Sequence, residues 1–326
     1  MIAGARRLIG DRVAAHHPES VVLGWGRTVL ALAQASVLAF TPAAYLFVPV
    51  GPHDGKPVCE GWARASAFCL GGGEHLQLIS WVLVALLLVV ASGLLPRYLS
   101  IVHFWVAISI SQSISLPDGG EAAAQAVTLF LVIASANDRR LFHWQRSTTA
   151  RRDSWWQGVA WAGSWGVRLQ VAYIYLNSSL AKLAVEPWQD GSATYYVSRM
   201  ESFGAAGLAD DLIRSATAQP VIALATAWGT IVLEFAIAWF LVAGGRRHAL
   251  ALGICVLLHL GILVQLGIVS FALIMVGAVT CAAASGLEGW RARPLTAEQD
   301  AASDPLGVPG VSDAEADPQG VLSRRA

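Results

Sequence analysis

The sequence predicts an all-α integral membrane protein, a bundle of about eight transmembrane helices with six as the alternative count. Of the 326 residues, 55% are hydrophobic and only 13% are charged, and the mean hydropathy is +0.55. Soluble globular proteins carry about 25% charged residues. Several apolar runs contain no charge over about 18 residues, which is enough to cross the hydrocarbon core as a helix. We therefore expect a multi-pass protein of the cell membrane.

The apolar runs place the expected spans along the chain. They lie near 28–50, 76–95, 99–116, 121–136, 158–183, 220–243, 249–267 and 269–286. The run from Ala249 to Ala284 would form about 54 Å of helix at 1.5 Å per residue, which is too long for one crossing of about 30 Å. We therefore divide it near 265–267 into a tight hairpin.

Arginine placement predicts the orientation. Most arginines flank the predicted spans on one side, and only Lys56, Arg64, Arg199 and Arg214 lie in loops on the other. Positive residues mark the cytoplasmic side, so both termini are predicted to be cytoplasmic.

The predicted organisation has three parts. They are a cytoplasmic segment over 1–22, a transmembrane domain over 23–288 with external loops 51–75 and 184–219, and a disordered cytoplasmic tail over 289–326. The tail is rich in Ala, Asp, Pro and Gly and has no apolar period, a composition typical of disorder. In loop 184–219, apolar residues at helical spacing predict short helices on the outer surface.

Five ionisable residues within the predicted spans are candidates for function: His103, Arg168, Lys182, Glu234 and His259. Such groups are costly in hydrocarbon and are functional candidates by default. The alternative is a purely structural role, in which Arg168 and Glu234 pair and hold the fifth and sixth helices in register. A lone histidine on an apolar helix is more often a packing residue, so His259 is a weaker candidate and His103 weaker still.

Lys182 has two open interpretations. Arg168, Tyr175 and Lys182 follow each other at seven-residue intervals and share one stripe of the fifth helix. A lysine at a helix end can simply extend its ammonium group to the interface. However, the chain has 20 arginines and only two lysines, and lysine alone of the two can lose its proton when desolvated. The second interpretation is therefore a base or nucleophile.

The cysteines fall into two groups. Cys255 and Cys281 lie in spans and are expected to pack as small apolar residues. Cys59 and Cys69 share an external loop, where we expect a disulfide; a redox-active thiol pair is the alternative. The sequence contains no HxxxH, HExxH or clustered Cys/His pattern, so we predict no metal site.

Two segments resemble a known family. RLQVAYIYLNSSLAKLAVEPWQDGSATYY, residues 168–196, resembles the central motif of the HTTM domain, the membrane domain of vitamin K-dependent γ-glutamyl carboxylase: a tyrosine-rich span, a small-residue pair, Lys-Leu and W-x-x-G. HLGILVQLGIVSFALIM, residues 259–275, resembles a later segment of that family. Over 160–280 the chain also resembles the shorter bacterial sporulation-delaying protein B group, which is associated with production of secreted antimicrobial peptides.

The resemblance implies roles for matching residues. Lys182 matches the carboxylase lysine that deprotonates vitamin K hydroquinone at the outer face, and His259 matches the family's span histidine. Trp188 and Gly191 match residues that shape the following turn, and Tyr175 would line the cavity. The implied cofactor is a menaquinone- or vitamin K-type quinol. The carboxylase also has a large lumenal domain that binds its substrate propeptide, so here capture would fall to the external loops or another protein.

We therefore predict a membrane factor that matures a secreted antimicrobial peptide by lysine-base, quinol-linked chemistry at the outer face. The expected partners are the bilayer, the peptide precursor and a small co-encoded protein, with no nucleic acid. Two alternatives are a non-enzymatic scaffold or immunity protein that binds the toxin precursor, and a quinone-dependent carboxylase-like enzyme with another substrate.

Overall fold

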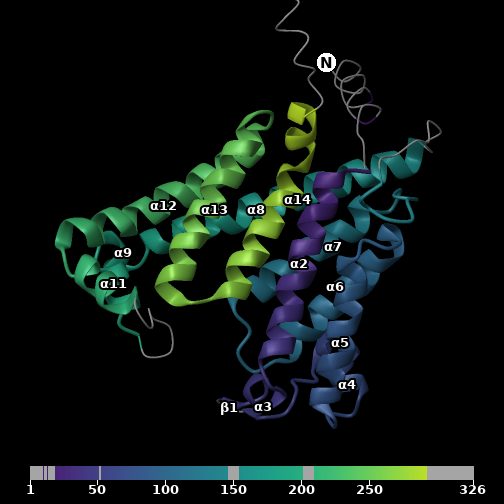
Figure 1. Ribbon diagram of the computed structural model, residues 1–326, viewed down its shortest axis with the longest axis horizontal. Coiled ribbons are helices and arrows are strands. Elements are labelled where there is room, and N and C mark those ends of the chain that lie inside the picture. Colours follow the sequence, from purple (N-terminus) through teal and green to yellow (C-terminus); the bar gives the residue numbers. More distant parts are fainter. Residues whose placement is uncertain are drawn as a thin grey trace, which may run out of the picture. The chain divides into compact units, whose positions relative to one another are not determined.

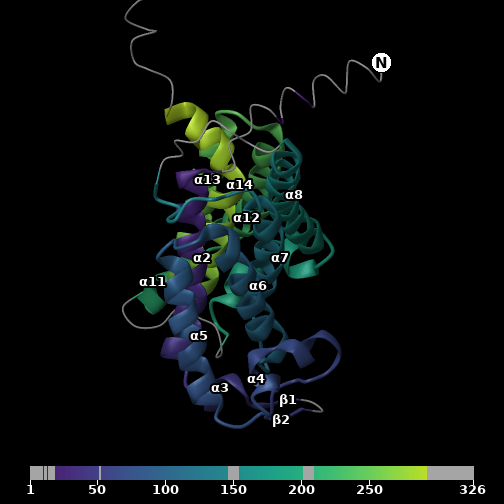
Figure 2. The same ribbon diagram turned by 90° about the vertical axis from the view of Figure 1, so that its right-hand side faces the viewer.

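The structure is a computed structural model that describes residues 10, 13, 19–50, 53–145, 154–200 and 209–291. Within these residues eight long helices make up the bundle seen in Figure 1 and Figure 2. They are α2 (Val21–Phe40), α5 (Leu76–Ala91), α6 (Pro96–Ser113), α7 (Gly119–Ala134), α8 (Ser154–Leu183), α12 (Pro220–Ala243), α13 (Arg247–Leu266) and α14 (Val269–Arg291). Each corresponds to one predicted span.

Four of these helices, α2, α12, α13 and α14, are long and apolar enough to cross a membrane by length and composition. Helices α5 and α7 are apolar but only 16 residues long. The all-α membrane protein is thus confirmed, whereas the number of crossings and the side of the termini stay predictions. The predicted tail lies outside the described residues beyond Arg291.

The first span was predicted too late in the chain. Instead of 28–50, the helix covers Val21–Phe40, and the Ser20 side chain caps it by accepting a hydrogen bond from the Leu23 amide at 3.0 Å. It ends before Thr41 because a residue that precedes proline disfavours the helical conformation. The rest of the predicted span forms the short helix α3 (Ala43–Leu46) and a hairpin of β1 (Pro49–Val50) with β2 (His53–Asp54).

Helix α2 belongs to two apolar clusters. One cluster contains residues of α2, α5 and α6, and the other contains residues of α2, α7, α8, α12, α13 and α14. Gly26 and Gly277 allow α2 and α14 to approach closely: a Cβ at Gly26 would lie 2.5 Å from Cys281 Sγ. Small residues at a crossing are the usual means by which membrane helices pack without a hydrophobic driving force.

Short elements lie in the two loops predicted to be external. The first holds the 3₁₀ helix η1 (Gly61–Ala65) and α4 (Ala67–Leu70), and the predicted disulfide between Cys59 and Cys69 is present. The second holds α9 (Glu186–Gln189), α10 (Ala193–Val197) and α11 (Asp210–Thr217), as expected from the apolar spacing.

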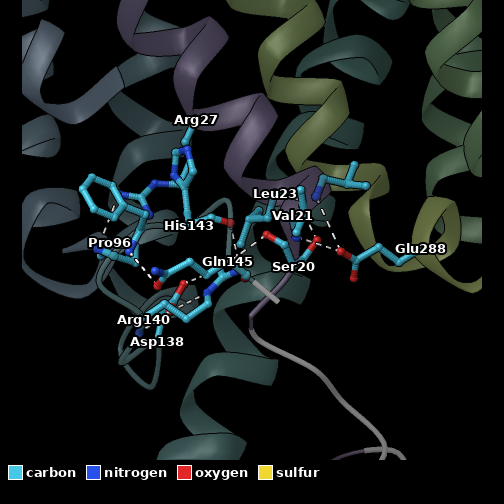
Figure 3. Close-up of polar contacts among 12 residues, drawn as sticks. Ser20, Val21, Leu23, Arg27, Pro96, Asp138, Arg140, His143, Gln145 and Glu288 are labelled. Atoms are coloured by element: carbon cyan, nitrogen blue, oxygen red, sulfur yellow. Dashed lines mark hydrogen bonds and ion pairs between the residues drawn. The ribbon is translucent and has the colours of Figure 1, made fainter. Parts of the chain in front are cut away.

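A buried polar cluster joins segments far apart in the sequence at the start of α2 (Figure 3). The Arg140 guanidinium donates two hydrogen bonds to the Asp138 carboxylate, at 2.9 and 2.7 Å, and others to the carbonyls of His143 and Gln145. The two charged side chains are only 6% and 3% exposed. Arg140 also reaches the Ser20 carbonyl, so the loop after α7 is fastened to the start of α2.

His143 is enclosed within the same cluster. A Cβ at Gly24 or at Gly93 would lie 2.8 or 2.5 Å from its ring, so both glycines make room for it. Thr28 donates its hydroxyl proton to the Ala91 carbonyl at 2.7 Å, so His143 Nε2, 3.3 Å away, carries a proton and donates to Thr28. Buried Nδ1 has no hydrogen-bond partner among the described residues. Burial first, and then Arg27 and Arg140, lower the pKa of His143 to about 3.

We therefore expect the free energy of unfolding to decrease as the pH is lowered below about 6.5. An unfolded histidine gains its proton near pH 6.5, whereas folded His143 stays neutral down to about 3. The unfolded state then binds more protons in that window, which costs up to about 1.4 kcal/mol per pH unit. Thermal unfolding in detergent between pH 7.5 and 5 tests this expectation. His143→Gln should flatten the slope of the unfolding midpoint against pH, and His75→Gln, at an exposed position, should leave that slope unchanged. An unchanged slope in His143→Gln would contradict it.

Candidate functional site

The candidate site is an ion pair between Lys182 at the end of α8 and Glu234 in the middle of α12. Lys182 Nζ lies 2.8 Å from Glu234 Oε1 and 2.9 Å from Oε2, so it contacts both carboxylate oxygens. Nζ also donates to Ser178 Oγ at 2.6 Å, and Ser178 donates to Glu234 Oε1 at 3.1 Å. The three side chains thus form a closed triangle of hydrogen bonds.

The spacing of polar residues on α8 builds this arrangement. Ser178, Ser179 and Lys182 are separated by intervals of one, three and four residues, which place them on one face of a helix. That face packs against α12, where Ser179 donates to the Ile231 carbonyl at 3.2 Å. Glu234 follows Ile231 by three residues and lies on the same side of α12. The contact between the two helices therefore brings the lysine and the carboxylate together.

The ion pair is neither solvent-exposed nor fully enclosed. The Lys182 side chain is 18% exposed and that of Glu234 is 8% exposed. The ammonium group also lies 5.2 Å from the centre of the Trp188 ring, a distance at which a cation is attracted to the aromatic face. The first interpretation of Lys182 requires an ammonium group that extends freely to the interface. The contacts with Glu234, Ser178 and Trp188 show that it does not.

The predicted pairing of Arg168 with Glu234 is wrong. Arg168 instead donates to the Ala282 carbonyl at 3.3 Å and to Ser285 Oγ at 2.6 Å, and so ties α8 to α14. The physical reason is position along the helix: Arg168 lies about 21 Å from Lys182 along α8 at 1.5 Å per residue. Glu234 lies level with Ser178 and Lys182 and cannot reach both cations.

Tyr175 and His259 are brought together about two turns of α8 away from Lys182, on the side of α13. The Tyr175 hydroxyl lies 3.3 Å from Cys255 Sγ, and its ring lies 6.1 Å from that of His259, edge to face. His259 Nδ1 lies 2.9 Å from the Cys255 carbonyl. A carbonyl only accepts hydrogen bonds, so Nδ1 carries the proton and Nε2 of the neutral ring is an acceptor.

Gly191 supports the site without touching the ion pair. It has a positive φ of 84°, and a Cβ there would lie 2.5 Å from the Leu224 side chain and 2.8 Å from its Cα. Only glycine therefore allows the turn between α9 and α10 to pack on the start of α12. This turn follows Trp188, so Gly191 helps to hold the indole beside Lys182.

Chemically, the arrangement can hold and move a proton. A lysine and a carboxylate in double contact can exist as an ion pair or, after transfer of one proton, as a neutral amine and a carboxylic acid. The neutral amine is a base. No cluster of three or more His, Cys, Asp or Glu side chains suited to a metal occurs in the described part of the chain.

A second group of buried polar residues surrounds His103, the one member that sequence reasoning identified. His103 Nε2 lies 3.1 Å from Gln34 Oε1, and Gln34 donates through Nε2 to Glu121 Oε2 at 3.0 Å. All three are at most 1% exposed and link α6, α2 and α7. Glu121 opens a predicted span and Arg27 flanks one, so the sequence does not mark either as buried. In the structure Arg27 is only 2% exposed and donates to the Pro96 carbonyl at 3.1 Å. A helical interval of seven places Arg27 and Gln34 on one face, which was the available signal.

Comparisons with known proteins identify bacterial relatives. The chain is 31% identical over 263 residues to the uncharacterized protein YitO of Bacillus subtilis, which covers 80% of this chain and 84% of the relative. It is 27% identical over 255 residues to the sporulation-delaying protein SdpB of the same organism, which covers 78% of each chain. No family model matches the chain, so the likeness to the HTTM domain stays a prediction. No solved structure matches it either.

Proposed function

The chain belongs to the family of the Bacillus subtilis protein YitO, and from that premise we propose that it is an integral membrane factor in the production of a secreted antimicrobial peptide. The similarity to SdpB and the HTTM-like segments at 168–196 and 259–275 support this proposal. The observation that carries the chemical part is the Lys182–Glu234 pair, a partly buried lysine in contact with both oxygens of a carboxylate.

In the proposed mechanism Lys182 acts as the base. Its ammonium group first gives a proton to Glu234, which leaves a neutral amine and a carboxylic acid with no net change of charge. The amine then accepts a proton from an acidic O–H group, and Lys182 becomes an ammonium ion again. Ser178, which both accepts from Lys182 and donates to Glu234, holds the two groups in line for the first transfer.

A menaquinone- or vitamin K-type quinol would supply the acidic O–H group. The residues present fit such a group in two respects: Lys182 is partly accessible, and the Trp188 ring beside it offers an aromatic face. The peptide precursor would be captured by loop 184–219 or by a small partner protein. His259, with its acceptor nitrogen, would line the same region from α13.

Lys182→Arg is expected to reduce the mature peptide by about 100-fold or more, the usual contribution of a general base. Arginine keeps the charge but has no accessible neutral form. Mass spectrometry of secreted peptide from producing cells measures the effect. Lys56→Arg is the matched control because Lys56 is exposed and pairs with Asp54 at the surface.

The same measurement separates the alternatives. A fixed mass difference between peptide made with and without this protein would indicate covalent chemistry, by a carboxylase-like or another modifying reaction. An unchanged mass, together with wild-type peptide levels from Lys182→Arg, would contradict the base role. That result would favour a non-enzymatic scaffold or immunity protein that binds the precursor.

A further inference from the structure

A cleft of about 600 Å³ lies between α12 and α13 and is bounded at one end by α10 and α11. Its volume falls within the range typical of small-molecule sites, about 300–1,000 Å³. The lining is aliphatic apart from four threonines and Gln265, and it includes no charged side chain in the described part of the chain. Both α12 and α13 are long and apolar enough to span the membrane.

Two glycines create the hollow in the middle of the cleft. Gly229 of α12 and Gly261 of α13 both line it, and a Cβ added at either would meet no atom within 4 Å. Gln265 of α13 donates to the Thr194 carbonyl, and the Thr194 hydroxyl contacts that of Thr226 in α12, so Gln265 and Thr226 lie at the same level of the cleft. Gly229 lies one turn after Thr226 in α12, and Gly261 lies one turn before Gln265 in α13. The two glycines are therefore at similar heights in the cleft.

The cleft has a polar end and an apolar end. Thr194, Thr226 and Gln265 lie at the end next to α10, whereas Leu233, Leu257 and Leu258 line the other. From Ile222 to Leu233 the cleft follows about 16 Å of helix axis at 1.5 Å per residue. This gradient suits an amphiphile with a small head group and one aliphatic chain.

The polar groups of the cleft are mainly acceptors. Thr226 and Thr230 donate their hydroxyl protons to the carbonyls of Ile222 and Thr226, each at 2.8 Å, which leaves oxygen lone pairs. Gln265 uses one N–H on the Thr194 carbonyl and retains its carbonyl oxygen and its second N–H, which suits a hydroxyl that both donates and accepts. A head group bound here would therefore donate a hydrogen bond, and it would be uncharged because no opposite charge lines the cleft.

We propose that this cleft binds a neutral single-chain lipid with a hydroxyl head group. The hydroxyl lies at Thr226 and Gln265, and the chain passes between Gly229 and Gly261 toward Leu233. A peptide segment fits less well because its backbone N–H and C=O groups need partners along their whole length, which the leucine end lacks.

The lipid site is separate from the ion pair. Glu234 follows Leu233 in α12 but faces α8, and it lies about 12 Å along the helix axis from Thr226 at 1.5 Å per residue. The hydroxyl end of the bound lipid is therefore remote from Lys182. The lipid is a bound component of the protein and is not the group that Lys182 deprotonates.

Photolabelling of the purified protein in detergent tests the site. The probe is hexadecanol with a diazirine in its chain, and labelled positions are mapped by peptide mass spectrometry. We expect labels on cleft residues such as Leu233 and Leu257, with competition by unlabelled hexadecanol and little by palmitate, whose head is charged. Gly229→Leu and Gly261→Leu fill the hollow and should reduce cleft labelling by about tenfold or more, the effect of a few methylene groups in an apolar pocket.

Gly253→Leu is the matched control. Gly253 also lies on α13 with no atom within 4 Å of an added Cβ, but it does not line the cleft, so labelling should persist. If Gly229→Leu or Gly261→Leu does not purify as a single species, Gln265→Leu is used instead. It removes the side-chain carbonyl that accepts from the lipid hydroxyl, and it should lower labelling of the cleft. Labels spread evenly over lipid-facing helices, equal competition by palmitate, or full labelling of the variants would each overturn the proposal. Peptide production is not the readout, so the outcome is independent of the proposed base chemistry.

Discussion

Exchanging the two charges, Lys182→Glu with Glu234→Lys, is expected to preserve the folded protein but to abolish peptide maturation. The exchanged pair can form the same ion pair between α8 and α12, whereas either single change leaves two like charges facing each other. Breaking a largely buried pair in this way costs about 3–5 kcal/mol. The exchange moves the amine to α12, away from the Trp188 ring, which lies 5.2 Å from Nζ in the native arrangement. Ser178 contacts both positions, so it stays next to the exchanged pair.

Two measurements together decide between a structural and a chemical role. Thermal unfolding in detergent should show the exchanged variant close to the wild type and each single variant well below it. Peptide mass spectrometry should show about a 100-fold loss or more in the exchanged variant, as for removal of a general base. Recovery of both stability and peptide production would mean that the pair only fastens α8 to α12.

Replacing Asp138 by Asn is expected to destabilise the fold by about 3–5 kcal/mol because the Arg140 guanidinium would remain buried without its counter-charge. The Arg140 side chain is 6% exposed and that of Asp138 3% exposed, with two hydrogen bonds between them. The loss extends beyond the pair, since Arg140 also holds the carbonyls of Ser20, His143 and Gln145 at the start of α2 (Figure 3). The midpoint of thermal unfolding in detergent measures the effect.

Arg139→Gln is the control for this prediction because Arg139 is the exposed neighbour of Arg140 and carries the same charge. It should shift the midpoint little, as surface substitutions usually do. The double variant Asp138→Asn with Arg140→Gln should cost less than the sum of the two single changes because they share one interaction. A wild-type midpoint for Asp138→Asn would show that the cluster does not fasten α2.

The candidate site illustrates how a membrane protein places a reactive charge. Ser178 and Lys182 come from one face of α8, Glu234 from α12, and Trp188 from the short helix after α8. Each group is ordinary by itself; their convergence puts an amine next to a proton acceptor at the edge of the bundle. The nearby Tyr175, Cys255 and His259 add a second polar group on the side of α13.

The sequence by itself determined the class of fold and the identity of the candidate groups. Long apolar runs reveal membrane helices because hydrocarbon tolerates few charges, so the expected spans match the long helices. Rarity of lysine and helical spacing singled out Lys182, and loop position predicted the Cys59–Cys69 disulfide. These are local properties, and they can be recognised without knowledge of neighbours in space.

Only the tertiary structure decided which groups meet. Periodicity defines a helix face but not the depth at which another helix crosses it, so Glu234 could be assigned to Arg168 when it belongs to Lys182. Arg27 flanks a predicted span and Glu121 opens one, and a sequence window does not reveal that a charged residue near a helix end is covered by neighbouring helices. The cleft at Gly229 and Gly261 also arises only from the packing of α12 against α13, because a glycine leaves a void only where neighbouring side chains fail to fill it.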